Sequence, residues 1–169
     1  MGLSLLPTTT MDAAADHLPT TTVATSVAGL YPIPSSGRVV YNFSQGWRFH
    51  LGDAEGAQAS TFDDSRWQVV NVPHTARLEP YEASGCRNYQ GVVWYRKTVD
   101  VPAAWQGKEL KLELSTIDDI DVTYFNGQAV GHTETCPVKR VYTIPADMVK
   151  AGRAVIAVRV LDIGSAGGL

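Results

Sequence analysis

The stretch from residue 110 to residue 130 constrains the fold of this chain most strongly. Apolar residues alternate there with polar ones, at Leu110, Leu112, Leu114, Ile120, Val122 and Tyr124. A period of two predicts β-strands with one apolar face. Asn126-Gly127 follows directly, and this pair is the strongest short signal for a hairpin because a type I′ turn needs positive φ at both central residues. The stretch therefore predicts a central antiparallel sheet.

Further short runs rich in β-branched and aromatic residues occur along the rest of the chain, at 39–41, 47–51, 68–72, 91–101, 140–144 and 154–161. The pattern predicts about eight or nine short strands and almost no helix, apart from one turn at 145–150, which is typical of an all-β antiparallel sandwich. No repeat of fixed period is present, which argues against a propeller or a solenoid.

The first 36 residues differ in composition from the remainder. They are rich in Thr, Ala, Ser and Pro and show weak apolar periodicity. Such a segment is expected to be a disordered leader or linker, followed by the sandwich over residues 37–169. The chain holds no apolar run near the ~20 residues of a membrane helix, so no membrane partner is expected.

The charge and the cysteines exclude some partners. The chain carries 14 Lys+Arg against 17 Asp+Glu, a net charge of -3, without a basic run, so nucleic acid is not an expected partner. Cys86 and Cys136 form no CxxC pair and have no His at zinc-ligand spacing, so we expect no metal site and no cofactor. A disulfide between them and two free thiols both stay open, and free thiols are favoured.

Charged residues near the central strands allow two interpretations. Asp118, Asp119 and Asp121 could offer oxygens to Ca²⁺, but the loop pattern of such sites is missing. We favour the interpretation that they cap turn backbone and face solvent. Arg96 and Arg159 lie between apolar strand residues. An unpaired buried charge is costly, so a carboxylate partner is expected, with Asp119 or Asp121 as candidates.

Residues 74–90 form the longest irregular stretch, and loops of this length are usually functional or mobile. The candidate carbohydrate-binding residues are Tyr81, Arg87, Asn88, Tyr89 and His74. Sugar rings stack on aromatic faces, and their hydroxyls bond to Asn, Arg and His side chains. The alternative is that these residues pin the loop to its own domain, and that His74 orders a turn.

No catalytic residue is assigned from the sequence. Gly52-Asp53-Ala54 resembles the start of an esterase nucleophile motif, but Ala54 stands where a Ser is required. The chain has no G-x-S-x-G elbow, and no Ser, His and Asp form a recognisable set. Independent catalysis is therefore not expected.

Five motifs in register resemble the N-terminal jelly-roll domain of family 2 glycoside hydrolases, a galactose-binding-like sandwich found in β-galactosidases, β-glucuronidases and β-mannosidases. They are Phe62–Trp67, Val72–His74, Trp94–Lys97, Tyr124–Gly131 and Val155–Val160. The second half is also similar to the jelly-roll module of sialate O-acetylesterases. The motifs there are Gly91–Lys97, Ile117–Asp121, Tyr142–Pro145 and Gly167-Gly168.

The resemblance implies an accessory domain that supports a catalytic domain elsewhere in a parent hydrolase. In some family 2 enzymes the loop before the Trp94–Lys97 motif reaches the active site, which would place residues 79–90 near a sugar. The expected partners are therefore a glycoside or polysaccharide and the parent's catalytic domain. A stand-alone glycan-binding module and a purely structural domain are the rivals.

The end of the chain departs from the family pattern. The family continues after its Gly-Gly segment into one more strand, whereas this sequence stops at Gly167-Gly168-Leu169. We therefore expect a fragment truncated before its last strand. The predicted leader and the expected degradative role favour a secreted or periplasmic location.

Overall fold

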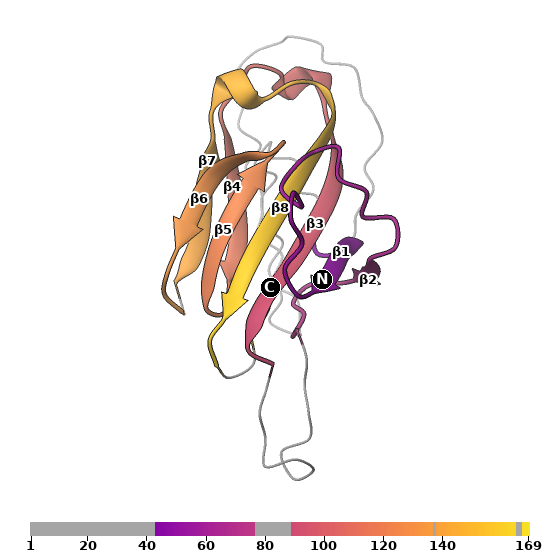
Figure 1. The fold of residues 1–169 in the computed structure, drawn as a ribbon. Coiled ribbons are helices and arrows are strands. Elements are labelled where there is room, and N and C mark those ends of the chain that lie inside the picture. Colours follow the sequence, from indigo (N-terminus) through magenta and orange to yellow (C-terminus); the bar gives the residue numbers. More distant parts are fainter. Residues whose placement is uncertain (1–42, 77–88, 137, 165–166) are drawn as a thin grey trace, which may run out of the picture. The chain divides into compact units, whose positions relative to one another are not determined.

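The computed structural model of the chain describes residues 43–76, 89–136, 138–164 and 167–169 (Figure 1). The strands in these ranges are β1 (Trp47–Leu51), β2 (Gln68–Val70), β3 (Gly91–Val101), β4 (Leu110–Thr116), β5 (Ile120–Phe125), β6 (Gln128–Thr133), β7 (Lys139–Ile144) and β8 (Gly152–Asp162). Two 3₁₀ turns, Ala103–Trp105 and Ala146–Met148, are the helical content of the same ranges. Because nearly all regular structure is antiparallel strand, the all-β prediction is confirmed. The predicted leader and the strand at 39–41 lie outside the described residues.

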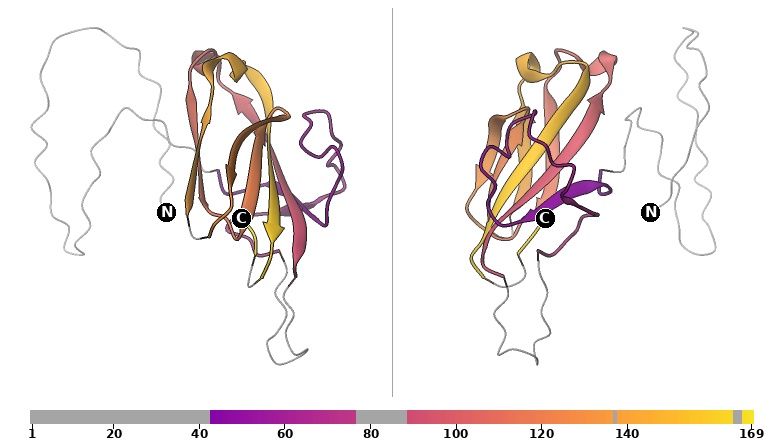
Figure 2. Two further views of the ribbon diagram at one scale, coloured as in Figure 1. Left: turned by 60° about the vertical axis from the view of Figure 1, so that its left-hand side comes forward. Right: turned by 45° about the vertical axis from the view of Figure 1, so that its right-hand side comes forward.

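The strands form two layers (Figures 1 and 2). The larger sheet has the order β2-β1-β3-β8-β5-β6, and the smaller one pairs β4 with β7. β3 and β8 pair along their whole length, from Gly91 opposite Asp162 to Val101 opposite Gly152. One buried cluster joins side chains of both sheets, among them Phe49, Tyr95, Leu112, Leu114, Ile144 and Val158. Within the described residues no helix is long and apolar enough to cross a membrane.

The hairpin between β5 and β6 turns at the predicted pair. Asn126 and Gly127 have φ angles of 49° and 87°, the positive values that a type I′ turn requires. Asn126 also ties the turn to β8, since its backbone N–H donates to Val155 O at 2.8 Å and its Oδ1 accepts from Val155 N at 2.8 Å. The predicted turn is therefore confirmed.

The buried face of β5 differs from the one that alternation favours. Asp121, Thr123 and Phe125 are 1%, 0% and 1% exposed, whereas the apolar alternate residues are half-buried on the other face. The interpretation that Asp121 faces solvent is therefore wrong. The physical reason is a partner distant in sequence, because Arg140 of β7 pairs with Asp121 inside the sandwich at 2.8 Å.

Residues 52–67 cover the outer face of the larger sheet, where Ala57, Trp94 and Ala157 form a second small core. Arg96, 2% exposed, fastens this loop by donating to several of its carbonyls and to the Asp64 carboxylate at 2.8 Å.

Arg159, from β8, donates to Asp53 at 2.7 Å. Both arginines thus have carboxylate partners, as expected, but the partners are Asp64 for Arg96 and Asp53 for Arg159, and neither is Asp119 or Asp121. The reason is that the loop, rather than the acidic corner, lies over this face of the sheet.

Candidate functional site

The segments on either side of the candidate loop meet at one end of the sandwich. β3 begins there, β8 ends opposite it, and Ile120 at the start of β5 pairs with Leu161. We call this surface the loop end, and its described residues are His74–Ala76, Tyr89–Gln90, Asp118–Asp119, Asp162–Gly164 and Gly167–Leu169.

Backbone hydrogen bonds close the base of the loop end. Residues 167–169 lie between two other segments of the chain. On one side Leu169 O accepts from His74 N at 2.6 Å and Gly167 O accepts from Ala76 N at 2.8 Å. On the other side Gly168 and Asp118 exchange two bonds of 3.0 and 3.2 Å. Residues 167–169 are therefore bonded on both sides, to residues 74–76 and to Asp118.

Neighbouring atoms lie so close to residues 167 and 168 that both positions require glycine. A Cβ at Gly167 would lie 2.0 Å from Oδ2 of Asp162, and a Cβ at Gly168 would lie 2.1 Å from the carbonyl oxygen of His74. No other residue lacks that atom, so only glycine fits at either position without movement of its neighbours.

His74, a predicted carbohydrate-binding residue, makes its described contacts within its own domain. Its Nδ1 shares a hydrogen bond of 2.9 Å with the Tyr95 hydroxyl, and its ring packs against Phe49 with centroids 4.7 Å apart. Burial lowers the pKa of His74, which favours the neutral form of the ring. These contacts fit the alternative in which His74 orders the chain, and a contact with sugar remains a prediction.

Tyr89 also makes a described contact within the domain. Its hydroxyl donates to Val92 O at 2.8 Å, and its ring is half-buried against the core. The ring covers Gly91, where an added Cβ would lie 2.9 Å from the Tyr89 hydroxyl. Gln90, next to it, is exposed at the loop end. Tyr81, Arg87 and Asn88 lie outside the described residues, and their assignment remains a prediction.

Three carboxyl groups gather at the loop end. A hydrogen bond to Asp119, together with burial, raises the pKa of Asp118. Burial, and then the charges of Asp119 and Asp118, raise the pKa of Asp162. The backbone N–H of Ile163 donates to Asp119 Oδ2 at 2.9 Å. The group can therefore accept hydrogen bonds and, where one carboxyl is protonated, donate one.

The thiol of Cys136 adjoins this group, and its hydrogen bond to Asp118 raises the pKa of Cys136. Cys136 is an exposed free thiol, while Cys86 lies outside the described residues. Among the described residues no group of three or more His, Cys, Asp and Glu side chains is placed to hold a metal ion.

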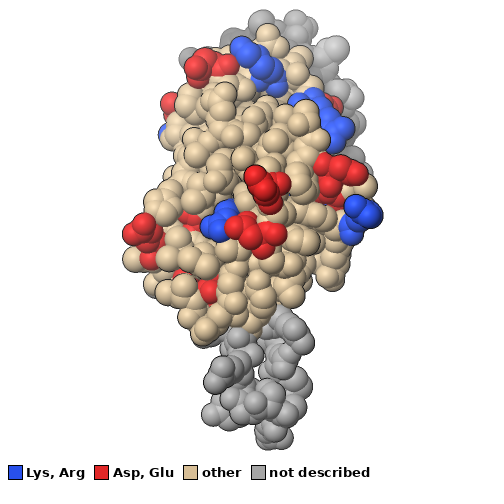
Figure 3. Space-filling view, viewed as in Figure 1, with Lys and Arg blue, Asp and Glu red and all other residues tan. Residues whose placement is uncertain are grey.

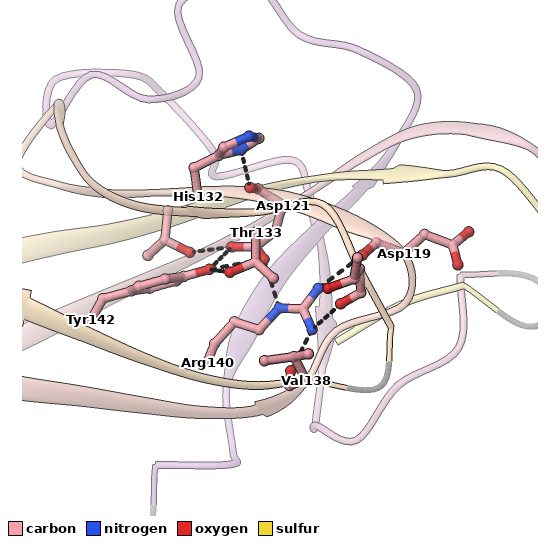
Figure 4. A network of polar contacts seen from close by, with 9 residues as sticks. Asp119, Asp121, His132, Thr133, Val138, Arg140 and Tyr142 are labelled. Carbon is pink, nitrogen blue, oxygen red and sulfur yellow. Dashed lines mark hydrogen bonds and ion pairs between the residues drawn. The ribbon is translucent and has the colours of Figure 1, made fainter.

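A buried polar network supports the loop end from beneath (Figure 4). The Arg140 guanidinium donates to Asp121 Oδ1 and to Asp119 O, both at 2.8 Å, and to the carbonyls of Thr135 and Val138. One arginine thus joins three segments: the start of β5, the segment before β7, and β7 itself.

Tyr142 completes the network. Its hydroxyl donates to both Asp121 oxygens, at 2.9 and 3.0 Å. Burial raises the pKa of Tyr142 to about 12, so the hydroxyl stays protonated and remains a donor. Thr123 donates a further bond to Asp121 at 2.9 Å. The carboxylate is therefore fully surrounded by donors, which is the condition for burying a charge.

Sequence reasoning did not identify Arg140 or Asp162 as parts of this site. A signal was present for both, because each occupies a position of strand alternation where an apolar residue would be expected. Asp162 follows Val158 and Val160 on one face of β8, and Arg140 precedes Tyr142 and Ile144 on β7.

Comparison with known proteins supplies the wider context. No protein-family profile matches the chain. It is 32% identical over 111 residues to a β-glucuronidase of Formosa agariphila, covering 61% of this chain and 11% of that protein. It is 32% identical over 95 residues to a β-galactosidase of Thermoanaerobacter pseudethanolicus, covering 56% of this chain and 13% of that protein. The chain thus spans a small fraction of the length of the curated relatives it matches.

The fold has solved counterparts as well. A glycosyl hydrolase family 2 member from Bacteroides cellulosilyticus superposes with a TM-score of 0.66 at 27% identity, covering 75% of this chain and 19% of that one. In sequence and in structure, the chain is therefore similar to one domain of family 2 glycoside hydrolases.

Proposed function

We propose that this chain is the non-catalytic accessory domain of a glycoside hydrolase, and that its loop end faces the catalytic domain and contributes residues 79–90 to the sugar site. The observation that carries the proposal is the similarity to a domain-sized part of much longer glycosidases. The finer role rests on the resemblance of the loop to one that reaches the active site in some family 2 enzymes.

The construction of the loop end supports this role. A loop that positions side chains against a substrate needs a rigid base, because a small displacement of a binding group weakens its contact. Here the base is held by the bonds of residues 167–169 and by the buried guanidinium of Arg140. The jelly-roll topology of the family is consistent with the observed two-layer sandwich and forms part of the same proposal.

A glycosidase parent is favoured over a sialate O-acetylesterase parent. The relatives named above are a β-glucuronidase and a β-galactosidase, and their names place the matched domain within enzymes that act on glycosides. We infer that the substrate of the parent is a glycoside or a polysaccharide.

The first experiment measures the hydrolytic activity of the purified chain alone. It is assayed with a panel of nitrophenyl glycosides and with nitrophenyl acetate. We expect no turnover above the buffer rate, because the catalytic groups are proposed to lie in another domain. Turnover that stays proportional to protein through a second chromatographic step would contradict the proposal.

The second experiment uses the parent hydrolase. Tyr81→Ala and Asn88→Ala are expected to lower kcat/KM for a nitrophenyl glycoside by about tenfold, the cost of one lost hydrogen bond or stacking contact. Lys108→Ala, an exposed position outside the loop end, is the matched surface control. Equal kcat/KM in the unmodified hydrolase and all three variants would contradict the proposal that the loop contributes to the sugar site.

A further inference from the structure

An open, shallow hollow lies on the outer face of the larger sheet, with a volume of about 660 Å³. Its walls are residues 60–65 of the covering loop, Arg48 of β1, the turn residue Asn126, and Arg153 and Val155 at the start of β8. In small-molecule sites, a small number of precisely placed polar groups fix the orientation of the ligand.

The hollow is far from the loop end. Arg153 is the second residue of β8, whereas Asp162 is its last residue. Nine residues of extended strand span roughly 30 Å. The β5–β6 turn at Asn126 is likewise at the opposite end of β5 from Asp118 and Asp119. A ligand in the hollow would therefore not touch the loop end.

The walls of the hollow are held in place before any ligand arrives. Arg96 donates to the carbonyls of Ala59 and Phe62 at 3.0 and 3.3 Å and to the Asp64 carboxylate at 2.8 Å. Two hydrogen bonds of 2.8 Å fix Asn126 to Val155 on the facing wall. A preformed site loses less conformational entropy on binding than a site that must order its loop.

The charges of the hollow favour an anion. The Asp64 carboxylate is already paired with Arg96. Asp63 accepts from Ser65 N at 3.0 Å, a bond that lowers the pKa of Asp63 and keeps it ionised. Arg48, whose guanidinium also donates to Trp67 O at 3.3 Å, and Arg153 both line the hollow. The charge of the adjacent Arg66 also lowers the pKa of Asp63, so positive side chains here outnumber the carboxylates that lack an ion-pair partner.

The positive excess is local to the hollow. Acidic and basic side chains are interspersed over the face shown in Figure 3, without an extended field of one sign. A highly charged polymer such as nucleic acid would need a longer basic surface. The hollow therefore suits a ligand with few negative charges and many hydroxyl groups.

We propose that the hollow binds a carboxylate-bearing sugar residue of a glycan, at a site separate from the loop end. The exposed guanidinium of Arg153 would take the carboxylate, for which its planar fork is matched. The hydroxyls of Ser60, Thr61 and Ser65 would exchange hydrogen bonds with the ring hydroxyls. This proposal does not depend on the chain having a catalytic partner.

The test is a titration of the isotope-labelled chain followed by amide NMR. The ligands are the tetramer of galacturonic acid, the neutral galactose tetramer, and sodium sulfate, at constant ionic strength. We expect saturable shifts with the acidic tetramer at residues 60–65, Asn126 and Arg153, at millimolar affinity, and weaker binding of the other two. Arg153→Ala is expected to weaken the acidic tetramer about tenfold, as for the loss of one charged contact.

Lys108→Ala is the matched control, because it removes one positive charge at an exposed position that does not line the hollow. Arg48→Ala is a second variant of the hollow and should also weaken binding. Shifts confined to Gln90, Asp118 and Asp119 would overturn the proposal while leaving the role of the loop end intact. Absence of saturable shifts, or equal binding of sulfate or of the neutral tetramer, would overturn it too.

Discussion

The pair of Asp121 and Arg140 shows how single residues organise this domain. Both side chains are 0% exposed and lie 2.8 Å apart, on different sheets of the sandwich. Taking two charges out of water costs free energy, which mutual attraction and further hydrogen bonds offset only when every polar atom is satisfied. Within the described residues no buried side-chain nitrogen or oxygen lacks a partner, so the condition is met.

Replacing one partner should therefore be far more damaging than replacing an exposed pair. Arg140→Met leaves Asp121 buried without its cation and is expected to destabilise the domain by about 3–5 kcal/mol. Lys139→Ala, which breaks the exposed pair with Glu113, should cost less than about 1 kcal/mol. Urea denaturation measures both, and equal unfolding midpoints for the two variants would contradict the assignment.

Asp162 leads to a prediction about pH. Its pKa is raised above the ordinary value of 3.8, mainly by burial, so the folded protein binds its proton more tightly than the unfolded chain does. The contribution of this group to stability therefore falls as the pH rises from 3.8 through the raised pKa. Asp162→Asn should raise the melting temperature at pH 7 and leave it unchanged at pH 3. A destabilising effect of equal size at both values would contradict this sign.

Among the elements, the covering loop 52–67 depends on a side chain of the sheet below it. Arg96 of β3 lies beneath the loop and bonds to its carbonyls and to Asp64. The loop has no regular secondary structure of its own. The hydrogen bonds from Arg96 therefore hold its backbone in the way that inter-strand hydrogen bonds hold a strand. Its conformation is thus a tertiary property of the molecule.

Removing the carboxylate of the loop should loosen it. Asp64→Ala leaves the Arg96 guanidinium without its ion-pair partner and is expected to destabilise the domain by about 2 kcal/mol. Proteolytic cleavage within residues 52–67, located by mass spectrometry, should become faster. Glu55→Ala removes an exposed carboxylate from the same loop and should change cleavage little. Identical cleavage of Asp64→Ala and the unmodified chain would argue against the role of Arg96.

The β5–β6 hairpin gives a second prediction for a single element. Asn126→Ala places an alanine at a φ of 49° and removes the bond to Val155 N. We expect destabilisation on the order of 1 kcal/mol. Gln128→Ala, at an exposed position of the same hairpin, serves as the control. An unchanged melting temperature for Asn126→Ala would show that the turn residue is dispensable.

For the whole molecule, stability is expected to come from the two-sheet core rather than from a bound ion. The main buried cluster draws on both sheets, and the described residues hold no group suited to a metal ion. EDTA is therefore expected to leave the melting temperature of the purified chain unchanged. A fall that added Ca²⁺ reverses would establish a cation site.

Local pattern was sufficient to predict the described strands, the hairpin and the sandwich, but not that residues 110–116 and 120–125 lie in different sheets. Period-two alternation specifies a strand from neighbours along the chain, and Asn126-Gly127 specifies a turn from two residues. The site was predicted less completely. The sequence predicts a sugar-binding role for the stretch after His74, which stays a prediction. It does not separate sugar binding from the contacts that His74 and Tyr89 make within the domain, and it does not identify Arg140 or Asp162.

The features that the sequence does not predict depend on contacts between residues that are distant in sequence. Asp121 meets Arg140 across 19 residues and Asp53 meets Arg159 across 106, so no local pattern reveals either pair. Burial of Asp121 instead of its apolar neighbours follows from that pairing, because a compensated charge can occupy a core position. The need for glycine at 167 and 168 likewise arises from Asp162 and His74. Alternation sets the strands, and long-range contacts decide which face is buried and which charges meet.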